Sequence, residues 1–187
     1  RSPRRYDVHL GDGSSESEFS SLVNALVHPV LALCGSRVAA QGEAAAVRIV
    51  RDGLVTSLPG ANAQPFHADG RGHGLYNAFL PLVALRTQGT EFWLASHLDE
   101  SAVDHVLSSQ TREYIGEGIL EDANIEPHIC APVLDRAEGI ILFDYRIFHR
   151  GRSHDSGELG PRPIFYRVYA VDGVAEDTHN WGKQKLP

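Results

Sequence analysis

The sequence predicts a mainly β fold, a β-sandwich of jelly-roll type with flanking helices. Two observations carry this prediction. Short apolar segments recur over residues 44–172, and turns rich in glycine and proline separate them. Many short strands with such punctuation are typical of an antiparallel sandwich or barrel. The length of 187 residues predicts a single domain over 1–187.

Two elements are expected before this strand-rich part. Residues 1–16 are polar and rich in glycine and serine, so we expect a flexible lead-in or a short strand there. A helix is predicted over 17–34, because Ser15 and Glu18 fit a capping box and apolar residues follow at helical spacing. Gly35 is expected to end it.

The strand-rich core is expected to contain one more helix, over residues 99–109, where Asp99 and Glu100 favour a helix N-terminus. The remaining apolar segments are expected to be strands. In chain order they are AAVRIV (45–50), LVTSL (54–58), QPFHAD (64–69), LYNAFLPLVAL (75–85), TEFWLA (90–95), APVL (131–134), GIILFDYRIFH (139–149) and PIFYRVYAV (163–171).

Composition excludes several classes of protein. A hydrophobic share of 42% and a charged share of 22% exclude wholesale disorder. No apolar run approaches the roughly 20 residues that cross a bilayer. The formal net charge of −7 argues against nucleic-acid or anionic-membrane partners and leaves a small-molecule substrate as the expected partner. The sequence carries no signal for the oligomeric state.

Cysteine usage bears on the compartment. Cys34 and Cys130 form neither a C-x-x-C pair nor a disulfide framework, which favours a reducing, intracellular setting, with the cytoplasm as the expected location. The chain starts at Arg1 and contains no methionine, so we expect a trimmed chain from which a targeting segment could have been removed.

His67-Ala68-Asp69 is the first chemical candidate. On a strand, residues i and i+2 point to the same face, so this histidine and aspartate could share one metal ion. Two histidines and one carboxylate on one side of a metal leave three adjacent positions open, as in non-haem Fe(II) oxygenases. His97-Leu98-Asp99 has the same pattern, and either pair taken alone also fits solvated loop residues.

The surrounding residues sharpen the choice. The segment 59–70 (PGANAQPFHADG) closely resembles the P-G-A-x-x-Q-P-x-H-x-D-G stretch of the phytanoyl-CoA dioxygenase family, which are Fe(II)- and 2-oxoglutarate-dependent oxygenases. The segment 89–97 (GTEFWLASH) is similar to that family's G-P-T-E-F-x-P-G-S-H stretch, which places His97 outside the metal site. The resemblance covers residues 44–171 and implies a double-stranded β-helix core, cupin-like in fold.

A second histidine must come from a later strand. Strand alternation over 139–149 places His149 on the same face as Tyr145, where a histidine is ordinarily a core residue. The run FDYRIFHRG, however, resembles the family's distal strand. The resemblance therefore implies that His67, Asp69 and His149 bind Fe(II).

The co-substrate 2-oxoglutarate also needs a cation for its far carboxylate, and the planar fork of arginine suits a carboxylate. Four arginines follow His149. The segment 161–166 (PRPIFY) resembles the family's P-R-P-x-x-Y strand, which favours Arg162. Arg167 has the opposite parity on a strand, so we expect it to pair with an acid or to pack on the other face.

Further candidates have structural readings that stay open. Thr90 and Asn77 could donate hydrogen bonds to the co-substrate, and Gln64 could reach metal-bound water. Aromatic side chains could line a substrate cavity, although an aromatic in a β-sandwich is usually a core residue. The aromatic candidates are Trp93, Tyr145 and Tyr166.

The resemblance implies an O₂-dependent hydroxylation of a small organic substrate, with release of succinate and CO₂ from 2-oxoglutarate. The intact Asp69 favours hydroxylation over halogenation. Three alternatives stay open: a cupin-type metalloenzyme that does not use 2-oxoglutarate, a non-catalytic jelly-roll binding domain, and modification of nucleic acid, which the net charge of −7 disfavours. Substrate identity depends on the loops 70–75 and 150–161, whose shapes the pattern does not predict.

Overall fold

The structure is a computed structural model that describes residues 4–11, 18–35, 46–86, 89–100, 128–134, 139–155 and 160–171. Two sequence predictions lie largely outside this part of the chain. They are the capping serine at position 15 and the second helix, of which only residues 99 and 100 are described.

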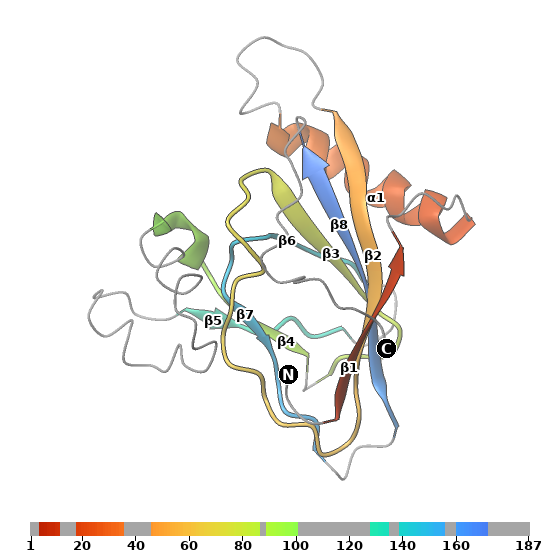
Figure 1. The fold of residues 1–187 in the computed structure, drawn as a ribbon, viewed down its shortest axis with the longest axis vertical. Coiled ribbons are helices and arrows are strands. Elements are labelled where there is room, and N and C mark those ends of the chain that lie inside the picture. The colour runs from red at the N-terminus through yellow and green to blue at the C-terminus, as the bar shows by residue number, and fades with distance from the viewer. Residues whose placement is uncertain are drawn as a thin grey trace, which may run out of the picture.

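The larger of two antiparallel sheets has five strands in the spatial order β1-β2-β8-β3-β6 (Figure 1). The central strand β8 is buried almost throughout, because both of its faces are covered. In spatial order the strands are β1 (Arg5–Gly11), β2 (Val47–Ser57), β8 (Arg162–Val171), β3 (Leu75–Pro81) and β6 (Ile141–Asp144).

The smaller sheet has three strands in the order β5-β4-β7, and the 3-10 helix η1 follows β4. The two sheets supply the hydrophobic clusters between them, such as Phe92 of β4 against Phe143 of β6. In chain order these elements are β4 (Thr90–Trp93), η1 (Ser96–Leu98), β5 (Ile129–Cys130) and β7 (His149–Gly151). The prediction of a mainly β chain is thus confirmed for the described residues.

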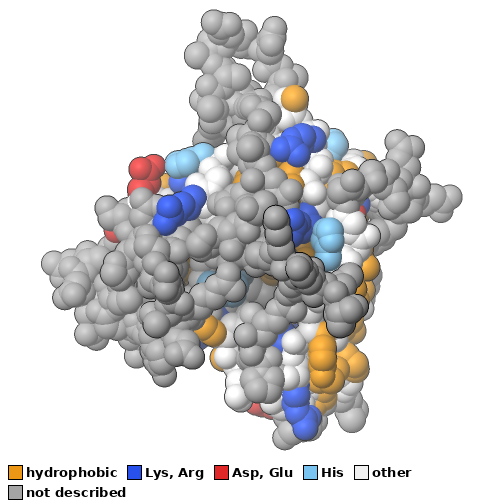
Figure 2. All heavy atoms as spheres, in the orientation of Figure 1, with side chains coloured by type: hydrophobic (Ala, Val, Ile, Leu, Met, Phe, Trp, Pro, Cys, Tyr) orange, Lys and Arg blue, Asp and Glu red, His pale blue; other side chains and the backbone are white. Residues whose placement is uncertain are grey.

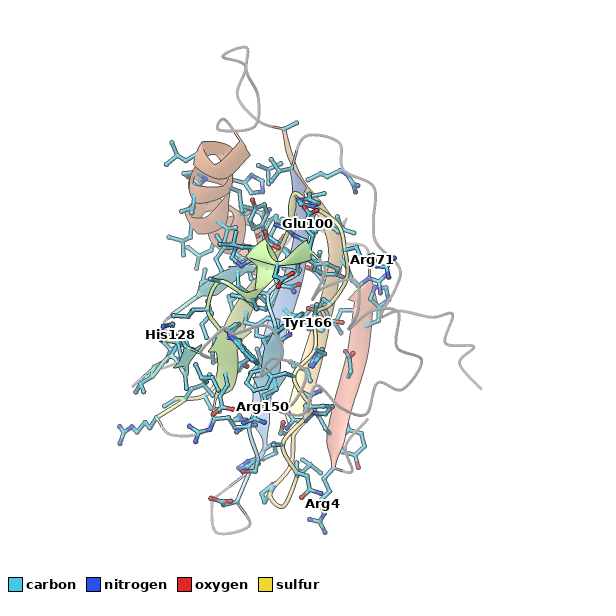
Figure 3. All side chains as sticks on the ribbon, turned by 90° about the vertical axis from the view of Figure 1, so that its left-hand side faces the viewer. Arg4, Arg71, Glu100, His128, Arg150 and Tyr166 are labelled. Carbon is cyan, nitrogen blue, oxygen red and sulfur yellow. The ribbon has the colours of Figure 1, made fainter. Side chains whose placement is uncertain are left out.

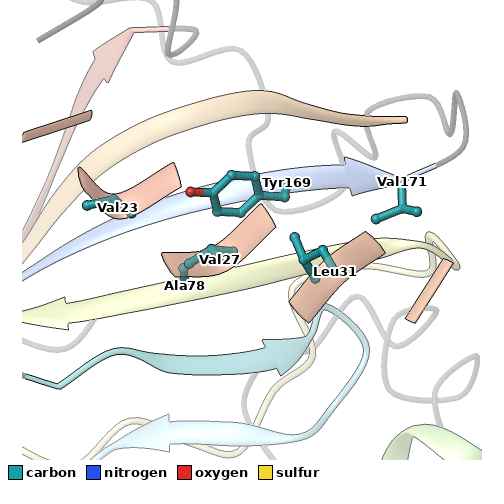
Figure 4. Close-up of a cluster of buried hydrophobic side chains, with 6 residues drawn as sticks. All are labelled: Val23, Val27, Leu31, Ala78, Tyr169 and Val171. Atoms are coloured by element: carbon teal, nitrogen blue, oxygen red, sulfur yellow. The ribbon is translucent and has the colours of Figure 1, made fainter. Parts of the chain in front are cut away.

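The helix α1 (Glu18–Gly35) covers the outer face of the large sheet (Figure 4). Val23, Val27 and Leu31 recur at helical spacing and pack against Tyr169 of β8 with other buried side chains of the sheet. The predicted helix over 17–34 is confirmed. Among the described helices, none is long and apolar enough to cross a membrane.

Strand β1 bears on the two expectations for residues 1–16, which were a flexible lead-in or a short strand. Residues 5–11 pair with β2 as an edge strand, so the short-strand alternative holds there and the flexible lead-in does not. Its side chains alternate. Tyr6, Val8 and Leu10 are exposed, and Figure 2 shows hydrophobic side chains gathered along this edge. Arg5 points the other way, toward the space between the sheets.

The prediction of one continuous strand over 139–149 is wrong. Strand β6 ends at Asp144, a turn follows, and β7 begins at His149. The reason is local, because the Asp144 carboxylate accepts a hydrogen bond from the backbone N–H of Arg146 at 2.9 Å. The Asp144 carbonyl also accepts one from the N–H of Ile147 at 3.1 Å. An aspartate that bonds the backbone two residues on stabilises a turn rather than a strand.

Candidate metal centre and cavity

A cavity of about 110 Å³ lies between the two sheets. The large sheet contributes side chains from β1, β2, β3 and β8, and the small sheet contributes side chains from β4 and β7. Figure 3 looks at the molecule from the small-sheet side and labels Tyr166, a residue of β8 that lines this cavity. The polar residues that the sequence singled out for the metal and the co-substrate all line this cavity. They are Gln64, His67, Asp69, Asn77, Thr90, His149 and Arg162.

His67, Asp69 and His149 meet in the cavity. Their potential ligand atoms all lie within 4.8 Å of one another, and they form the one such group of three or more among the described residues. The backbones of His67 and His149 exchange two hydrogen bonds, of 3.0 and 2.9 Å. Such an antiparallel pair places both side chains on the same face, and the two ring centroids are 4.6 Å apart.

Both imidazoles are oriented by the backbone. The Nδ1 of His67 lies 3.0 Å from the carbonyl oxygen of Pro65, and the Nδ1 of His149 lies 3.0 Å from that of Ile147. Because a carbonyl oxygen only accepts, each Nδ1 must donate, and each Nε2 presents its lone pair to the cavity. Burial, and next the neighbouring His149, lowers the pKa of His67 to about 4, which keeps this imidazole neutral at neutral pH.

The carboxylate of Asp69 is held in the same way. Asn77, buried on β3, donates a hydrogen bond from Nδ2 to Oδ2 of Asp69 at 2.6 Å. The same carboxylate oxygen lies 3.6 Å from Nε2 of His149. Two imidazole nitrogens and one carboxylate oxygen, each fixed by a neighbouring hydrogen bond, are a donor set that fits a divalent iron-type metal.

One of the four arginines after His149 lines the cavity. Arg162 is 5% exposed and donates from an Nη to the carbonyl oxygen of Arg152 at 2.8 Å. The side chains of Arg150 and Arg152 instead contact Glu91, at 2.6 and 3.2 Å. Arg167 pairs with an acid on the opposite face of β8, as its parity predicted.

Gln64 and Thr90 also line the cavity. The Oε1 of Gln64 accepts a hydrogen bond from the backbone N–H of Gly151 at 2.9 Å, so Gln64 holds β7 against the 64–69 segment. Thr90 is buried and pairs with Gly151 in the ladder between β4 and β7. Asn77 also lines the cavity, and its hydrogen bond positions the carboxylate of the triad residue Asp69.

The three aromatic candidates differ in their position relative to the cavity, because Tyr166 lines it and the other two do not. Trp93 and Tyr145 are not among the residues that line this cavity, and their role as substrate contacts stays a prediction. Alternation along β4 turns Thr90 toward the cavity and Trp93 away from it, where Trp93 packs edge-on against Phe66 at 5.9 Å between ring centroids. Tyr145 lies in the turn after β6 and is 1% exposed within the hydrophobic core.

Tyr166 does line the cavity and reaches across the sheet. Its hydroxyl donates to Oδ1 of Asp7 on β1 at 3.2 Å. The ring passes over Gly53 of β2, where any Cβ would overlap it, so a glycine is required at that position. Burial, and next the charge of Asp7, raises the pKa of Tyr166, which therefore remains a hydrogen-bond donor at neutral pH.

The sequence interpretation missed two charged residues of the cavity, Arg5 and Asp7, both on β1. Their signal was present in the period of two along residues 5–11, which places both on one face if that segment is a strand. His97, from the second H-x-D pattern, lies in η1 and is not among the cavity-lining residues.

Comparison with known proteins supports the fold. No protein-family model matches the chain, and no curated protein sequence matches it. Membership of the phytanoyl-CoA dioxygenase family therefore stays a prediction.

Solved structures are similar in fold at low sequence identity. HygX from Streptomyces hygroscopicus, solved with nickel and 2-oxoglutarate bound, has a TM-score of 0.56 and 10% identity, over 90% of this chain and 70% of HygX. AviO1 from Streptomyces viridochromogenes Tue57 has a TM-score of 0.59 and 16% identity, over 91% of this chain and 69% of AviO1. SnoK, a non-haem α-ketoglutarate-dependent carbocyclase from nogalamycin biosynthesis, has a TM-score of 0.62 and 14% identity, over 89% of this chain and 63% of SnoK. The chain thus has the fold seen in these three solved structures.

Proposed function

We propose that this protein is an Fe(II)- and 2-oxoglutarate-dependent dioxygenase that hydroxylates a small organic substrate. One observation carries the proposal. His67, Asp69 and His149 converge in a cavity that Arg162 also lines, so a metal-binding donor set and a carboxylate-binding cation share one space. The similarity in fold to HygX and SnoK supports the same class, and it supports a double-stranded β-helix, or jelly roll, as the architecture.

The three ligand residues have matched roles in this proposal. His67 and His149 bind Fe(II) through Nε2, because Nδ1 of each ring donates to a backbone carbonyl. Asp69 binds through its carboxylate, which Asn77 holds in place at 2.6 Å. The bound Fe(II) supplies O₂ activation coupled to the conversion of 2-oxoglutarate to succinate and CO₂.

Arg162 orients the co-substrate. Its guanidinium can bind the carboxylate of 2-oxoglutarate that lies farther from the keto group, and its hydrogen bond to the Arg152 carbonyl fixes its position. The buried aromatic rings next to His149, such as Phe92 and Phe143, shield that imidazole from water.

The cavity also bears on the substrate. Its lining combines apolar side chains with a few convergent polar groups, as small-molecule sites do, and the hydroxyl of Tyr166 is one of these polar groups. The presence of a carboxylate at Asp69 favours hydroxylation, as the sequence resemblance implies. HygX has been solved with the small molecule hygromycin B bound, which is consistent with a small-molecule substrate for this fold.

The proposal is tested by anaerobic titration of the Fe(II)-loaded protein with 2-oxoglutarate, followed by metal-to-ligand charge-transfer absorption in the visible range. We expect a saturable band from the wild type. The His67→Ala variant should give none, because it lacks one ligand. The His73→Ala variant is the matched control, since the His73 side chain is 66% exposed and lies outside the cavity lining.

The same titration separates the alternatives. Stoichiometric iron binding without a charge-transfer band would contradict the use of 2-oxoglutarate and favour a cupin-type metalloenzyme. Absence of iron binding by the folded wild type would contradict the enzyme proposal and favour a jelly-roll binding domain.

A further inference from the structure

Two arginines from different strands meet at one end of the cavity. Arg5 lies on the edge strand β1, and Arg162 lies on β8, with β2 between them. An Nη of Arg5 donates to the carbonyl oxygen of Arg152 at 3.0 Å, and an Nη of Arg162 donates to the same oxygen at 2.8 Å. Because both guanidinium groups bond one atom, they are direct neighbours, and both line the cavity.

The fold makes room for Arg5 at this place. The guanidinium lies against the backbone of Gly151 on β7, where any Cβ would overlap it. A second hydrogen bond, of 3.2 Å, joins an Nη of Arg5 to the carbonyl oxygen of Asn62. Arg5 therefore spans from the edge of the large sheet to the small sheet, beside the strand that carries His149.

The charges of the two arginines oppose each other. Burial, and next the positive charge of Arg162, lowers the pKa of Arg5 to about 10, so Arg5 is still charged at neutral pH. The carbonyl oxygens of Asn62 and Arg152 are among the acceptors that position the two guanidinium groups in the cavity lining. An anion bound beside both groups would turn this repulsion into attraction.

A carboxylate suits this pair of arginines. Its two oxygens have about four lone-pair sites, so it can accept hydrogen bonds from two guanidinium groups at once. Bonds of this kind between two ionised groups are about twice as strong as neutral ones. The triad lies in the same cavity, which is where the near end of a 2-oxo acid would bind.

We propose that Arg5 is a second anchor for the far carboxylate of 2-oxoglutarate and acts together with Arg162. This inference rests on the proposed function and deepens it. It makes the edge strand β1 part of the co-substrate site. It also gives the cavity a means to select a dicarboxylic 2-oxo acid over a monocarboxylic one, since a single carboxylate engages only the metal.

The experiment measures the affinity of the Fe(II)-loaded protein for 2-oxoglutarate and for pyruvate, a 2-oxo acid without a far carboxylate, by anaerobic charge-transfer titration. We expect Arg5→Gln to weaken 2-oxoglutarate binding roughly 10- to 100-fold and to leave pyruvate binding unchanged. Arg5→Lys, which keeps the charge but not the fork, should give an intermediate affinity. Circular dichroism verifies that each variant is folded.

Arg4→Gln is the matched control. Arg4 is the preceding residue, it is exposed, and its guanidinium bonds the carbonyl of Pro59 outside the cavity lining. This variant changes the net charge by the same amount and should bind 2-oxoglutarate as the wild type does.

Three results would overturn the inference. Equal 2-oxoglutarate affinity of Arg5→Gln and the wild type would remove Arg5 from the site. Equal weakening of 2-oxoglutarate and pyruvate would show that Arg5 supports the metal centre and not the far carboxylate. A wild type that binds Fe(II) but gives no band with 2-oxoglutarate would contradict the proposed function itself, and the role of Arg5 with it.

Discussion

Arg162 and Arg167 lie on the same strand, β8, and face opposite sides of the large sheet. On the outer side, beneath α1, Arg167 forms a bidentate pair with Asp52, with both contacts at 2.6 Å. On the inner side, Arg162 donates to the carbonyl oxygen of Arg152 at 2.8 Å and to the hydroxyl of Ser57 at 3.5 Å. Both arginines are at least 95% buried, since they are 2% and 5% exposed.

The two arginines differ in what they face, because Arg167 pairs with Asp52 and Arg162 lines the cavity. Burial acts to lower the pKa of Arg167, but the hydrogen bonds and charge of Asp52 outweigh burial and raise it. The positive charge on the outer face is thus balanced within the fold. Arg162 donates to the Arg152 carbonyl oxygen and to the Ser57 hydroxyl, and it lines the cavity together with Arg5. One strand therefore carries one arginine for stability and another arginine suited to an anionic ligand.

The largest expected effect comes from breaking the outer pair. We expect Asp52→Asn to lower the free energy of unfolding by about 3–5 kcal/mol, because it leaves the Arg167 guanidinium buried without a balancing charge. Urea denaturation measures this loss. Glu100→Gln is the control, since the Glu100 side chain is 75% exposed and its removal should change stability by less than about 0.5 kcal/mol. A loss below about 1 kcal/mol for Asp52→Asn would contradict a structural role for this pair.

Replacement of Arg162 should affect 2-oxoglutarate binding strongly and the free energy of unfolding only weakly. We expect Arg162→Gln to weaken 2-oxoglutarate binding roughly 100-fold, while the free energy of unfolding changes by only about 1 kcal/mol. Relief of repulsion with Arg5 offsets part of the lost hydrogen bonding. The charge-transfer titration and urea denaturation give the two quantities for the same preparation.

A matched variant for this prediction is Arg152→Gln. It removes an arginine side chain that is 41% exposed and contacts Glu91, but it keeps the backbone carbonyl that Arg5 and Arg162 share. It should bind 2-oxoglutarate as the wild type does. If Arg162→Gln destabilised the fold as strongly as Asp52→Asn and left binding intact, the distinction between the two faces would be lost.

The odd spacing between Arg162 and Arg167 explains why the sequence predicted that they lie on opposite faces of one strand. Residues 162 and 167 differ by an odd number, so a regular strand must send them to opposite faces, as β8 does. The same rule predicted one face for His67 and Asp69, and their side chains do meet in the cavity. The predicted strand over 64–69 is wrong, however, because the segment forms only an isolated bridge at His67. Helical spacing likewise predicted α1 almost to its ends, although Leu22 and Leu26 of the predicted pattern are exposed and the buried face is formed by Val23, Val27 and Leu31.

The features that the sequence did not predict depend on contacts between distant segments or on local hydrogen bonds. The break between β6 and β7 follows from the Asp144 carboxylate bonding the backbone of Arg146, which apolar periodicity cannot reveal. Arg5 reaches the cavity only because β1 pairs with β2 and a glycine at position 151 leaves space. Trp93 showed that an aromatic near a site can belong to the core, since alternation along β4 turns it away.

The smallest effect compares two serines that contact the two arginines. Ser20 of α1 accepts a hydrogen bond from Arg167 at 2.9 Å, whereas Ser57 of β2 lies 3.5 Å from its donor on Arg162. A short bond to a charged donor stabilises by about 1 kcal/mol or more, and a 3.5 Å contact contributes much less. After correction for helix propensity, we therefore expect Ser20→Ala to lower the free energy of unfolding by about 1 kcal/mol more than Ser57→Ala does.

Helix propensity must be separated from this hydrogen bond, because alanine is the better helix former by about 0.5 kcal/mol. Ser21→Ala provides the correction, since Ser21 is exposed on the same helix. The loss for Ser20→Ala, measured relative to Ser21→Ala by urea denaturation, should then be about 1 kcal/mol, with 2-oxoglutarate affinity unchanged. Ser57→Ala should leave stability nearly unchanged, and any effect should fall on 2-oxoglutarate affinity, because Ser57 lines the cavity beside Arg162. Equal stability losses at the two serines would mean that both faces of β8 hold their arginines with the same strength, and the ligand-facing character of Arg162 would lose its support.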